Sequence, residues 1–159
     1  VPNDVDEHFL VKNRMMEGRF DKSYLSLTIA PTMACNFRCV YCFEQGHYGN
    51  KSMDKKTQES IIQFVEKQIS NIKRLNIVWY GGEPLLALPV VENLSLKFIE
   101  LCKTHNVQYN ASIVTNGFLL TREVAQKLKE WRVDFAQITV DGPQEIHDLW
   151  SMELVATKQ

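Results

Sequence analysis

Strand-like and helix-like segments alternate four times along this chain, and that alternation restricts the available folds more than any other feature. The strands are expected at residues 25–32, 75–80, 107–115 and 133–142. In the first, LSLTIAPT, apolar and polar residues alternate with a period of two, which is typical of a strand with two different faces. Short loops between alternating strands and helices require right-handed crossovers, so the sequence predicts an α/β fold with a parallel sheet.

An amphipathic helix is expected after each of the first three strands. Asp54 and Thr121 occupy N-cap positions for the first and third of these helices. The apolar side chains of the three helices recur at intervals of three and four, and are Ile61, Val65, Ile69 and Ile72, then Val91, Leu94, Phe98, Leu101 and Cys102, then Val124, Leu128 and Trp131.

Two architectures satisfy this pattern, an open doubly wound sheet and a barrel. Buried strands of a doubly wound sheet are usually continuous Val/Ile/Leu runs, whereas here one face of the first and fourth strands is polar. The polar residues are Ser26, Thr28, Gln137, Thr139 and Asp141. The four units occupy residues 25–142 at about 30 residues each, close to the roughly 31 per unit of an eight-unit barrel. We therefore expect a partial parallel (β/α) barrel.

Three cysteines, Cys35, Cys39 and Cys42, follow the first strand with the spacing C-x3-C-x2-C. The loop lies at the carboxyl end of the strand, where barrel enzymes build their sites. A disulfide uses two thiols and a closed structural zinc site uses four ligands, so three cysteines indicate another chemistry. Three thiolates can each hold one iron of a four-iron cluster and leave the fourth iron open to a small molecule.

A zinc site completed by Cys102 or His47 is the competing interpretation of the cysteines. Cys102 lies on the apolar face of the second expected helix, where a free cysteine is usually a small core residue. No H-x3-H pair of the kind that zinc sites commonly use accompanies the cysteines. The pattern therefore favours the iron–sulfur interpretation.

The composition limits which binding partners and which cellular compartment are expected for this chain. Hydrophobic residues make up 45% and charged residues 23% of the chain, and the formal net charge is −1. This balance is typical of a globular protein and predicts neither nucleic acid nor an anionic membrane as a partner. No apolar run approaches the roughly 20 residues of a membrane span. We expect a reducing, cytoplasmic setting, in which clustered cysteines are metal ligands or redox groups.

Four blocks of sequence carry a resemblance to a known family. They are LTIAPTMACNFRCVYCFE at 27–44, YGGEPLL at 80–86, VTNG at 114–117 and ITVDGPQEIHD at 138–148. The cysteine block resembles the cluster motif of the radical S-adenosylmethionine (SAM) superfamily. All four blocks, in their order and spacing, are similar to its peptide- and protein-maturing branch, which includes SPASM-type peptide maturases and anaerobic sulfatase-maturing enzymes. The resemblance extends from residue 9 to about residue 148.

The resemblance implies a chemistry that the cofactors carry. Cys35, Cys39 and Cys42 would ligate a [4Fe-4S] cluster whose open iron binds SAM. An external electron donor would reduce the cluster, and cleavage of SAM would give a 5'-deoxyadenosyl radical that takes a hydrogen from a peptide or protein substrate. The expected outcome is a thioether or other crosslink in a ribosomal peptide. The alternatives are a sulfatase-maturing, formylglycine-generating enzyme and a non-catalytic iron–sulfur remnant.

The same resemblance implies the residues of the SAM pocket. Tyr41 would lie against the adenine, and Asn116 would help to line the pocket. Thr139 stands where the family usually has serine, and its hydroxyl would reach the ribose. The methionine amino group would be bound by Gly81, Gly82, Glu83 and Pro84.

Each of these segments also has an ordinary structural interpretation. The two glycines would turn the chain out of a strand, Glu83 with Pro84 would open a helix, and T-N-G would form a turn. Asp141, Gly142 and Pro143 also match a turn, although Asp141 shares the inward phase of Thr139. His147 and Asp148 are expected in an exposed loop, and His47, Tyr48 and Gly49 are expected to shape the loop after the cluster.

The expected organisation has three parts: a helical lead-in at 1–24, a truncated radical SAM barrel at 25–148 and an atypical tail at 149–159. The family's barrel has six strand–helix units, of which about four are expected here. The tail departs from the family's pattern, and a frameshift is one hypothesis for it. On this basis we expect the chain by itself to be incomplete and inactive.

Overall fold

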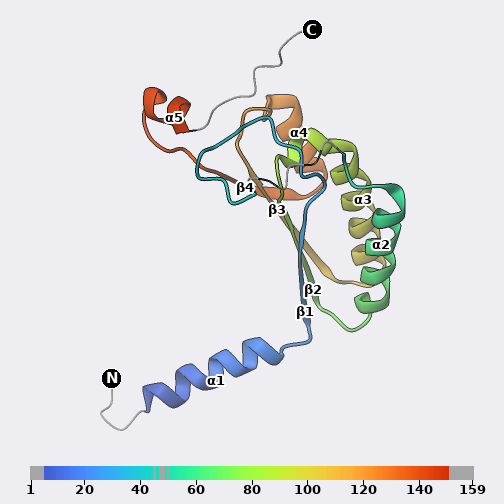
Figure 1. The fold of residues 1–159 in the computed structure, drawn as a ribbon. Coiled ribbons are helices and arrows are strands. Elements are labelled where there is room, and N and C mark those ends of the chain that lie inside the picture. Colours follow the sequence, from blue (N-terminus) through green and yellow to red (C-terminus); the bar gives the residue numbers. More distant parts are fainter. Residues whose placement is uncertain (1–5, 45, 47–48, 50, 151–159) are drawn as a thin grey trace.

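The computed structural model describes residues 6–44, 46, 49 and 51–150, and Figure 1 shows how its elements are arranged. Four strands alternate with helices along the chain. In order, the elements are α1 (Glu7–Phe20), β1 (Tyr24–Ile29), α2 (Lys55–Ile69), β2 (Arg74–Trp79), the 3-10 helix η1 (Pro84–Ala87), α3 (Leu88–Thr104), β3 (Gln108–Thr115), α4 (Arg122–Glu130), β4 (Val133–Ile138) and α5 (Gln144–Trp150).

The four strands form one parallel sheet in the order β1-β2-β3-β4. Because each crossover joins neighbouring strands in the same direction, the connecting helices α2, α3 and α4 are placed on one face of the sheet. A doubly wound sheet requires the strand order to reverse, and this order does not. The prediction of a partial (β/α) barrel with about four units is therefore confirmed.

The hydrophobic core lies between the sheet and the helices α2 and α3, which run side by side in Figure 1. Leu75, Ile77 and Trp79 of β2 are fully buried in it. The opposite face of the sheet is polar, and there Asn76 donates a hydrogen bond to the Ser26 hydroxyl at 3.2 Å. A sheet with one apolar and one polar face is what the alternating pattern of the first strand predicted.

Helix α2 and helix α4 begin at the predicted caps. The Asp54 carboxylate accepts a hydrogen bond from the Thr57 amide at 2.7 Å, and the Thr121 hydroxyl accepts one from the Val124 amide at 3.2 Å. Helix α1 buries none of its side chains and extends away from the sheet (Figure 1). No helix in the described ranges is long and apolar enough to cross a membrane.

Two expectations near the end of the chain are wrong. The fourth strand ends at Ile138 rather than at residue 142, because its pairing with β3 ends where Thr115 meets Ile138. His147 and Asp148 belong to α5 and not to a loop. The predicted boundaries at residues 24 and 148 stay predictions. Of the expected tail, 151–159 lies outside the described residues, as do His47 and Tyr48 of the expected loop.

Candidate cofactor site

The loops that follow the four strands meet at the carboxyl edge of the sheet around a cavity of about 160 Å³. Each of the four loops contributes residues that the sequence singled out. Those lining the cavity are Cys39, Tyr41, Cys42, Gly81, Gly82, Asn116 and Thr139. Three other predicted residues, Cys35, Glu83 and Pro84, belong to the same loops but do not line it. The topology thus brings most of the predicted site to one place.

The cysteine loop forms a compact turn that is held by hydrogen bonds within the loop. The Cys42 amide donates to the Cys39 carbonyl at 3.1 Å, and the Arg38 guanidinium donates to the Cys35 carbonyl at 2.9 Å. The Phe37 amide donates to the Cys35 sulfur at 3.3 Å. Burial raises the pKa of the Cys35 thiol, and this amide lowers it in part. An N–H aimed at a cysteine sulfur favours the thiolate that a metal cluster requires.

The three thiols are the candidate ligands of a metal group in this loop. Among the described residues, no set of three or more Cys, His, Asp or Glu side chains is arranged to hold one metal ion. In a four-iron cluster each thiolate binds a different iron, so the sulfurs need not converge on one point. All three thiols are partly exposed, and the side-chain nitrogen of Asn36 next to them is buried without a hydrogen-bond partner in the described structure. The zinc alternative through Cys102 is not supported, since Cys102 is packed in the core.

Gly81 and Gly82 bring the loop after β2 into direct contact with the cysteine loop. The Gly82 amide donates to the Thr32 carbonyl at 3.2 Å, and the Glu83 amide donates to the Ala34 carbonyl at 2.8 Å. A Cβ on Gly82 would lie 2.3 Å from the Ala34 oxygen, and Gly81 adopts φ = 113°. Both positions therefore require glycine for close backbone approach, beyond any role in turning the chain.

The Glu83 carboxylate is fully buried and engaged by three protein donors. One oxygen accepts from the Leu85 amide at 2.9 Å and the Thr115 hydroxyl at 2.8 Å. The other accepts from the Asn116 amide at 2.8 Å. Burial raises the pKa of the Glu83 carboxyl, and the donors lower it in part. Glu83 thus caps the 3-10 helix η1, as its ordinary interpretation expected, and also ties that loop to the end of β3.

Asn116 joins the loop after β3 to the cysteine loop. Its side-chain nitrogen donates to the Asn36 side-chain oxygen at 2.9 Å, and its own side-chain oxygen accepts from the Phe118 amide at 3.0 Å. The second contact is a local turn closed by an asparagine side chain, so the turn interpretation of T-N-G holds beside the pocket position. Thr139 is exposed and follows directly after β4.

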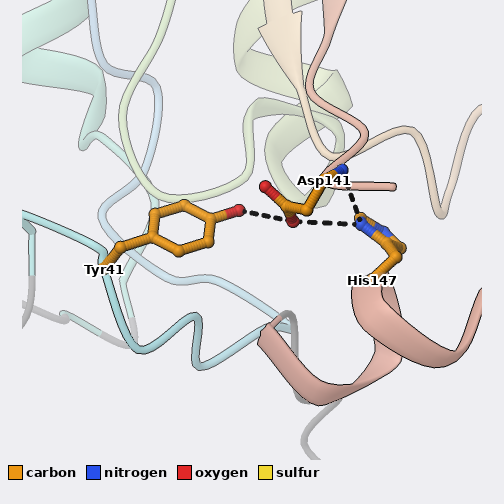
Figure 2. A network of polar contacts seen from close by, with 3 residues as sticks. All are labelled: Tyr41, Asp141 and His147. Carbon is orange, nitrogen blue, oxygen red and sulfur yellow. Dashed lines mark hydrogen bonds and ion pairs between the residues drawn. The ribbon is translucent and has the colours of Figure 1, made fainter. Parts of the chain in front are cut away.

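A polar network that the sequence analysis missed links the cysteine loop to the segment after β4 (Figure 2). The Tyr41 hydroxyl donates to the Asp141 carboxylate at 2.9 Å, and His147 Nδ1 lies 3.1 Å from the same oxygen. The expectation that His147 sits in an exposed loop is wrong because α5 turns its ring toward Asp141. Pro143 followed by Glu145 is a helix-start signal that would have placed His147 in a helix.

Comparison with known proteins relates the chain to enzymes of known class. TigE of Paramaledivibacter caminithermalis, a radical SAM cyclopropyl synthase, is 32% identical over 85% of this chain and 30% of its own length. A cysteine-type anaerobic sulfatase-maturating enzyme of Clostridium perfringens is 33% identical over 79% of this chain and 35% of its own length. A GTP 3',8-cyclase of Campylobacter jejuni is 32% identical over 80% of this chain and 38% of its own length. The chain thus spans between 30% and 38% of the length of these relatives.

Solved structures agree in fold and in part of the sequence. Native anSMEcpe with bound AdoMet and the Kp18Cys peptide superposes with a TM-score of 0.67 at 31% identity, covering 82% of this chain and 36% of that one. Residues 29–153 match the family described as the radical SAM superfamily. This match includes every strand end that contributes to the cavity, and the chain therefore belongs to the radical SAM superfamily.

Proposed function

We propose that this chain holds a [4Fe-4S] cluster on Cys35, Cys39 and Cys42, binds SAM beside it and serves in the radical modification of a peptide or protein. The observation that carries the proposal is the direct docking of the Gly82 turn onto the cysteine loop at the carboxyl edge of the sheet. That docking places backbone polar groups next to three partly exposed thiols, in a chain of the radical SAM superfamily.

The predicted residues of the loop after β2 each have a proposed task toward the cofactor. Gly81 and Gly82 offer backbone polar groups to the methionine amino group, because their missing Cβ leaves room for close approach. The Glu83 carboxylate is already engaged by protein donors, so its task is to hold this turn in place. Pro84 is buried behind it and starts η1.

The remaining pocket residues surround the nucleoside end of SAM. The Tyr41 ring lies against the adenine, Thr139 offers its hydroxyl to the ribose and Asn116 lines the pocket between them. A [4Fe-4S] cluster held by Cys35, Cys39 and Cys42 would supply, once reduced by an external donor, the electron for the cleavage of SAM. The protein's own part is to orient SAM and to keep water from the reacting atoms.

A peptide or protein is the substrate class that the relatives favour. The C. perfringens relative is named for sulfatase maturation, and anSMEcpe is found with the Kp18Cys peptide. The proposed product is a thioether or other crosslink in a ribosomal peptide, with formylglycine formation in a sulfatase as the alternative. Nucleic acid and membranes have no proposed role. A cluster of three cysteines in one loop favours a reducing, cytoplasmic setting, in which such residues are metal ligands or redox groups.

Two other functions compete with this one. A nucleotide substrate is favoured by the identity to a GTP 3',8-cyclase, which is as high as the identity to TigE. A non-catalytic iron–sulfur protein would hold the cluster without binding SAM. Mass spectrometry after incubation with a sulfatase-derived cysteine peptide, a candidate precursor peptide or GTP distinguishes the substrates, because each product differs in mass.

The test of the cofactor proposal begins with anaerobic reconstitution of the chain with iron and sulfide. We expect roughly four irons per chain and a reduced cluster with an electron paramagnetic resonance (EPR) signal. Adding SAM should change that signal, because only an open iron can take the ligand. A four-iron protein whose EPR signal ignores SAM would instead support the non-catalytic alternative.

A further inference from the structure

Tyr41 and Asp141 connect the two strands that lie at opposite edges of the sheet. Tyr41 follows β1 and Asp141 follows β4, and the strand order β1-β2-β3-β4 puts two strands between them. Their hydrogen bond of 2.9 Å nevertheless spans 100 residues of sequence. It therefore closes the ring of loops around the cavity that Tyr41 also lines.

His147 supports the carboxylate from the other side, as Figure 2 shows. Its Nδ1 atom is 3.1 Å from the Asp141 oxygen that also accepts from Tyr41. The Asp141 amide lies 3.4 Å from the same ring nitrogen. Nδ1 donates to the carboxylate only when it carries the proton, so these two contacts cannot both be hydrogen bonds at once. The tautomer with the proton on Nδ1 donates to the carboxylate across the shorter contact, and it is the form in which His147 orients Asp141.

The short segment between Asp141 and His147 fixes their geometry. Gly142 adopts φ = 151°, and the Pro143 carbonyl accepts from the amides of Ile146 and His147 at 2.9 and 3.0 Å. The His147 and Asp141 side chains are 25% and 19% exposed, whereas Tyr41 is 50% exposed. The carboxylate is thus more enclosed than the ring that it binds.

We propose that Asp141, oriented by His147, is a positioning residue that holds the Tyr41 ring at the wall of the cofactor pocket through the phenol hydroxyl. The inference rests on the proposed binding of SAM in that pocket. A half-exposed aromatic ring on a loop has free rotamers, and tying its hydroxyl to a partly buried carboxylate removes that freedom before the ligand arrives. The network therefore preorganises the pocket.

The experiment compares substitutions that remove one contact each in the reconstituted 159-residue chain. Tyr41→Phe removes only the hydroxyl. His147→Asn leaves an amide nitrogen near the position of Nδ1, whereas His147→Gln places its amide nearer the position of Nε2 and loses the contact. His105→Gln, on an exposed histidine at the end of α3, is the matched control. The measurements are iron content, circular dichroism and the SAM dissociation constant by anaerobic equilibrium dialysis.

We expect Tyr41→Phe and His147→Gln to keep iron and fold but to weaken SAM binding about three- to tenfold, the range of one lost hydrogen bond. His147→Asn should stay within about twofold of the unmodified chain, as should His105→Gln. His147 also lines the cavity. If its effect on SAM runs through the Tyr41 hydroxyl, as proposed, the double variant Tyr41→Phe/His147→Gln should bind no more weakly than Tyr41→Phe alone.

Several results would overturn the inference. Unchanged affinity in Tyr41→Phe, equal affinities for the two His147 variants, or additive losses in the double variant would each remove the link from His147 to Tyr41 while leaving SAM binding intact. Loss of iron in Tyr41→Phe would make the hydroxyl a support of the cluster loop instead. An unmodified chain with its irons that fails to bind SAM would overturn the proposed function itself, and this inference with it.

Discussion

Glu83 is a buried residue whose hydrogen-bond partners in the structure are all donors. All three of its partners are donors, the amides of Leu85 and Asn116 and the Thr115 hydroxyl. A carboxylate accepts from all of them, whereas an amide group presents a donor of its own to at least one. The residue is therefore specified by hydrogen bonds within the protein, independently of any cofactor.

Glu83→Gln should destabilise the fold by about 1 to 3 kcal/mol, the cost of leaving a buried donor unsatisfied. Denaturant unfolding of the cofactor-free chain measures it. Glu100→Gln provides the control, because Glu100 is exposed and its pair with Lys97 is solvent-screened, with an expected loss of about 0 to 1 kcal/mol. Equal losses in the two variants would show that the Glu83 contacts contribute nothing beyond a surface pair.

A substitution of Gly82 would test whether iron binding by the cysteine loop depends on the neighbouring turn. In Gly82→Ala the new Cβ would meet the carbonyl oxygens of Ala34 and Met33 at 2.3 and 2.6 Å, and backbone atoms cannot rotate away. The loop must therefore move, and we expect iron uptake to fall well below that of the unmodified chain. In Gly18→Ala, on helix α1, nothing lies within 4 Å of the added carbon, so iron uptake should be unchanged. Full iron uptake by Gly82→Ala would contradict the proposed dependence.

The cysteines separate into two chemical classes. Cys102 is packed in the core, and this burial raises its pKa to about 11. Cys102 therefore stays a thiol at neutral pH. Cys39→Ala should therefore abolish cluster formation, while Cys102→Ala should keep the iron and lose only core contacts. Iron and sulfide analysis after reconstitution measures both. The cluster assignment would not survive retention of the iron in Cys39→Ala.

At the scale of the elements, the sequence predicts helix and strand boundaries best where the interactions that set them are local. The caps at Asp54 and Thr121 bond to amides three residues away, so a short window of sequence contains the whole interaction. The end of β4 was misjudged because its alternating pattern continues beyond Ile138, whereas the strand stops where β3 no longer pairs with it. A strand's length depends on its neighbour as well as on its own pattern.

The site follows the same rule. The positions of the glycines and cysteines could be predicted because their spacing is local. The hydrogen-bond partners of the neighbouring Glu83 and Tyr41 could not be predicted, because they lie far away in the sequence. Glu83 meets Thr115 and Asn116 from 32 and 33 residues away, and Tyr41 meets Asp141 from 100. Such contacts are set by the curvature of the whole sheet, which no local pattern encodes. The roles of the predicted residues toward SAM stay predictions.

A substitution of Thr139 would test whether the loop after β4 contributes a hydroxyl to SAM binding. It is exposed and lines the cavity, so removing its hydroxyl in Thr139→Val should leave the cluster intact. A hydrogen bond to the ribose at an exposed position suggests a loss of about two- to tenfold in SAM affinity. Thr104→Val at the end of α3 should bind SAM normally. Unchanged affinity in Thr139→Val would place this hydroxyl outside the binding contacts.

At the scale of the whole molecule, the sheet divides the chain into a side that stabilises and a side that binds. The helices cover the apolar face with the core, while the polar face carries Ser26 and Asn76 and stays accessible. Every loop that reaches the cavity leaves the carboxyl edge, where the parallel strands all end. One topology therefore separates folding from cofactor binding, so variants of pocket residues that lie outside the core should leave the core intact.

The same topology leaves β4 with a single partner among the described residues, and this predicts self-association of the chain. Past Val133, every residue of β4 is exposed, including Phe135 at 63% and Ile138 at 43%. An edge strand with exposed apolar side chains offers unpaired backbone groups to another chain, and lysine on an edge opposes such pairing.

We expect concentration-dependent dimers or larger species by light scattering, shifted toward monomer in Phe135→Lys. Leu96→Lys, on the exposed face of α3, should not produce that shift. A chain that is monomeric at high concentration, or equal effects of the two lysines, would show that β4 is not the associating surface.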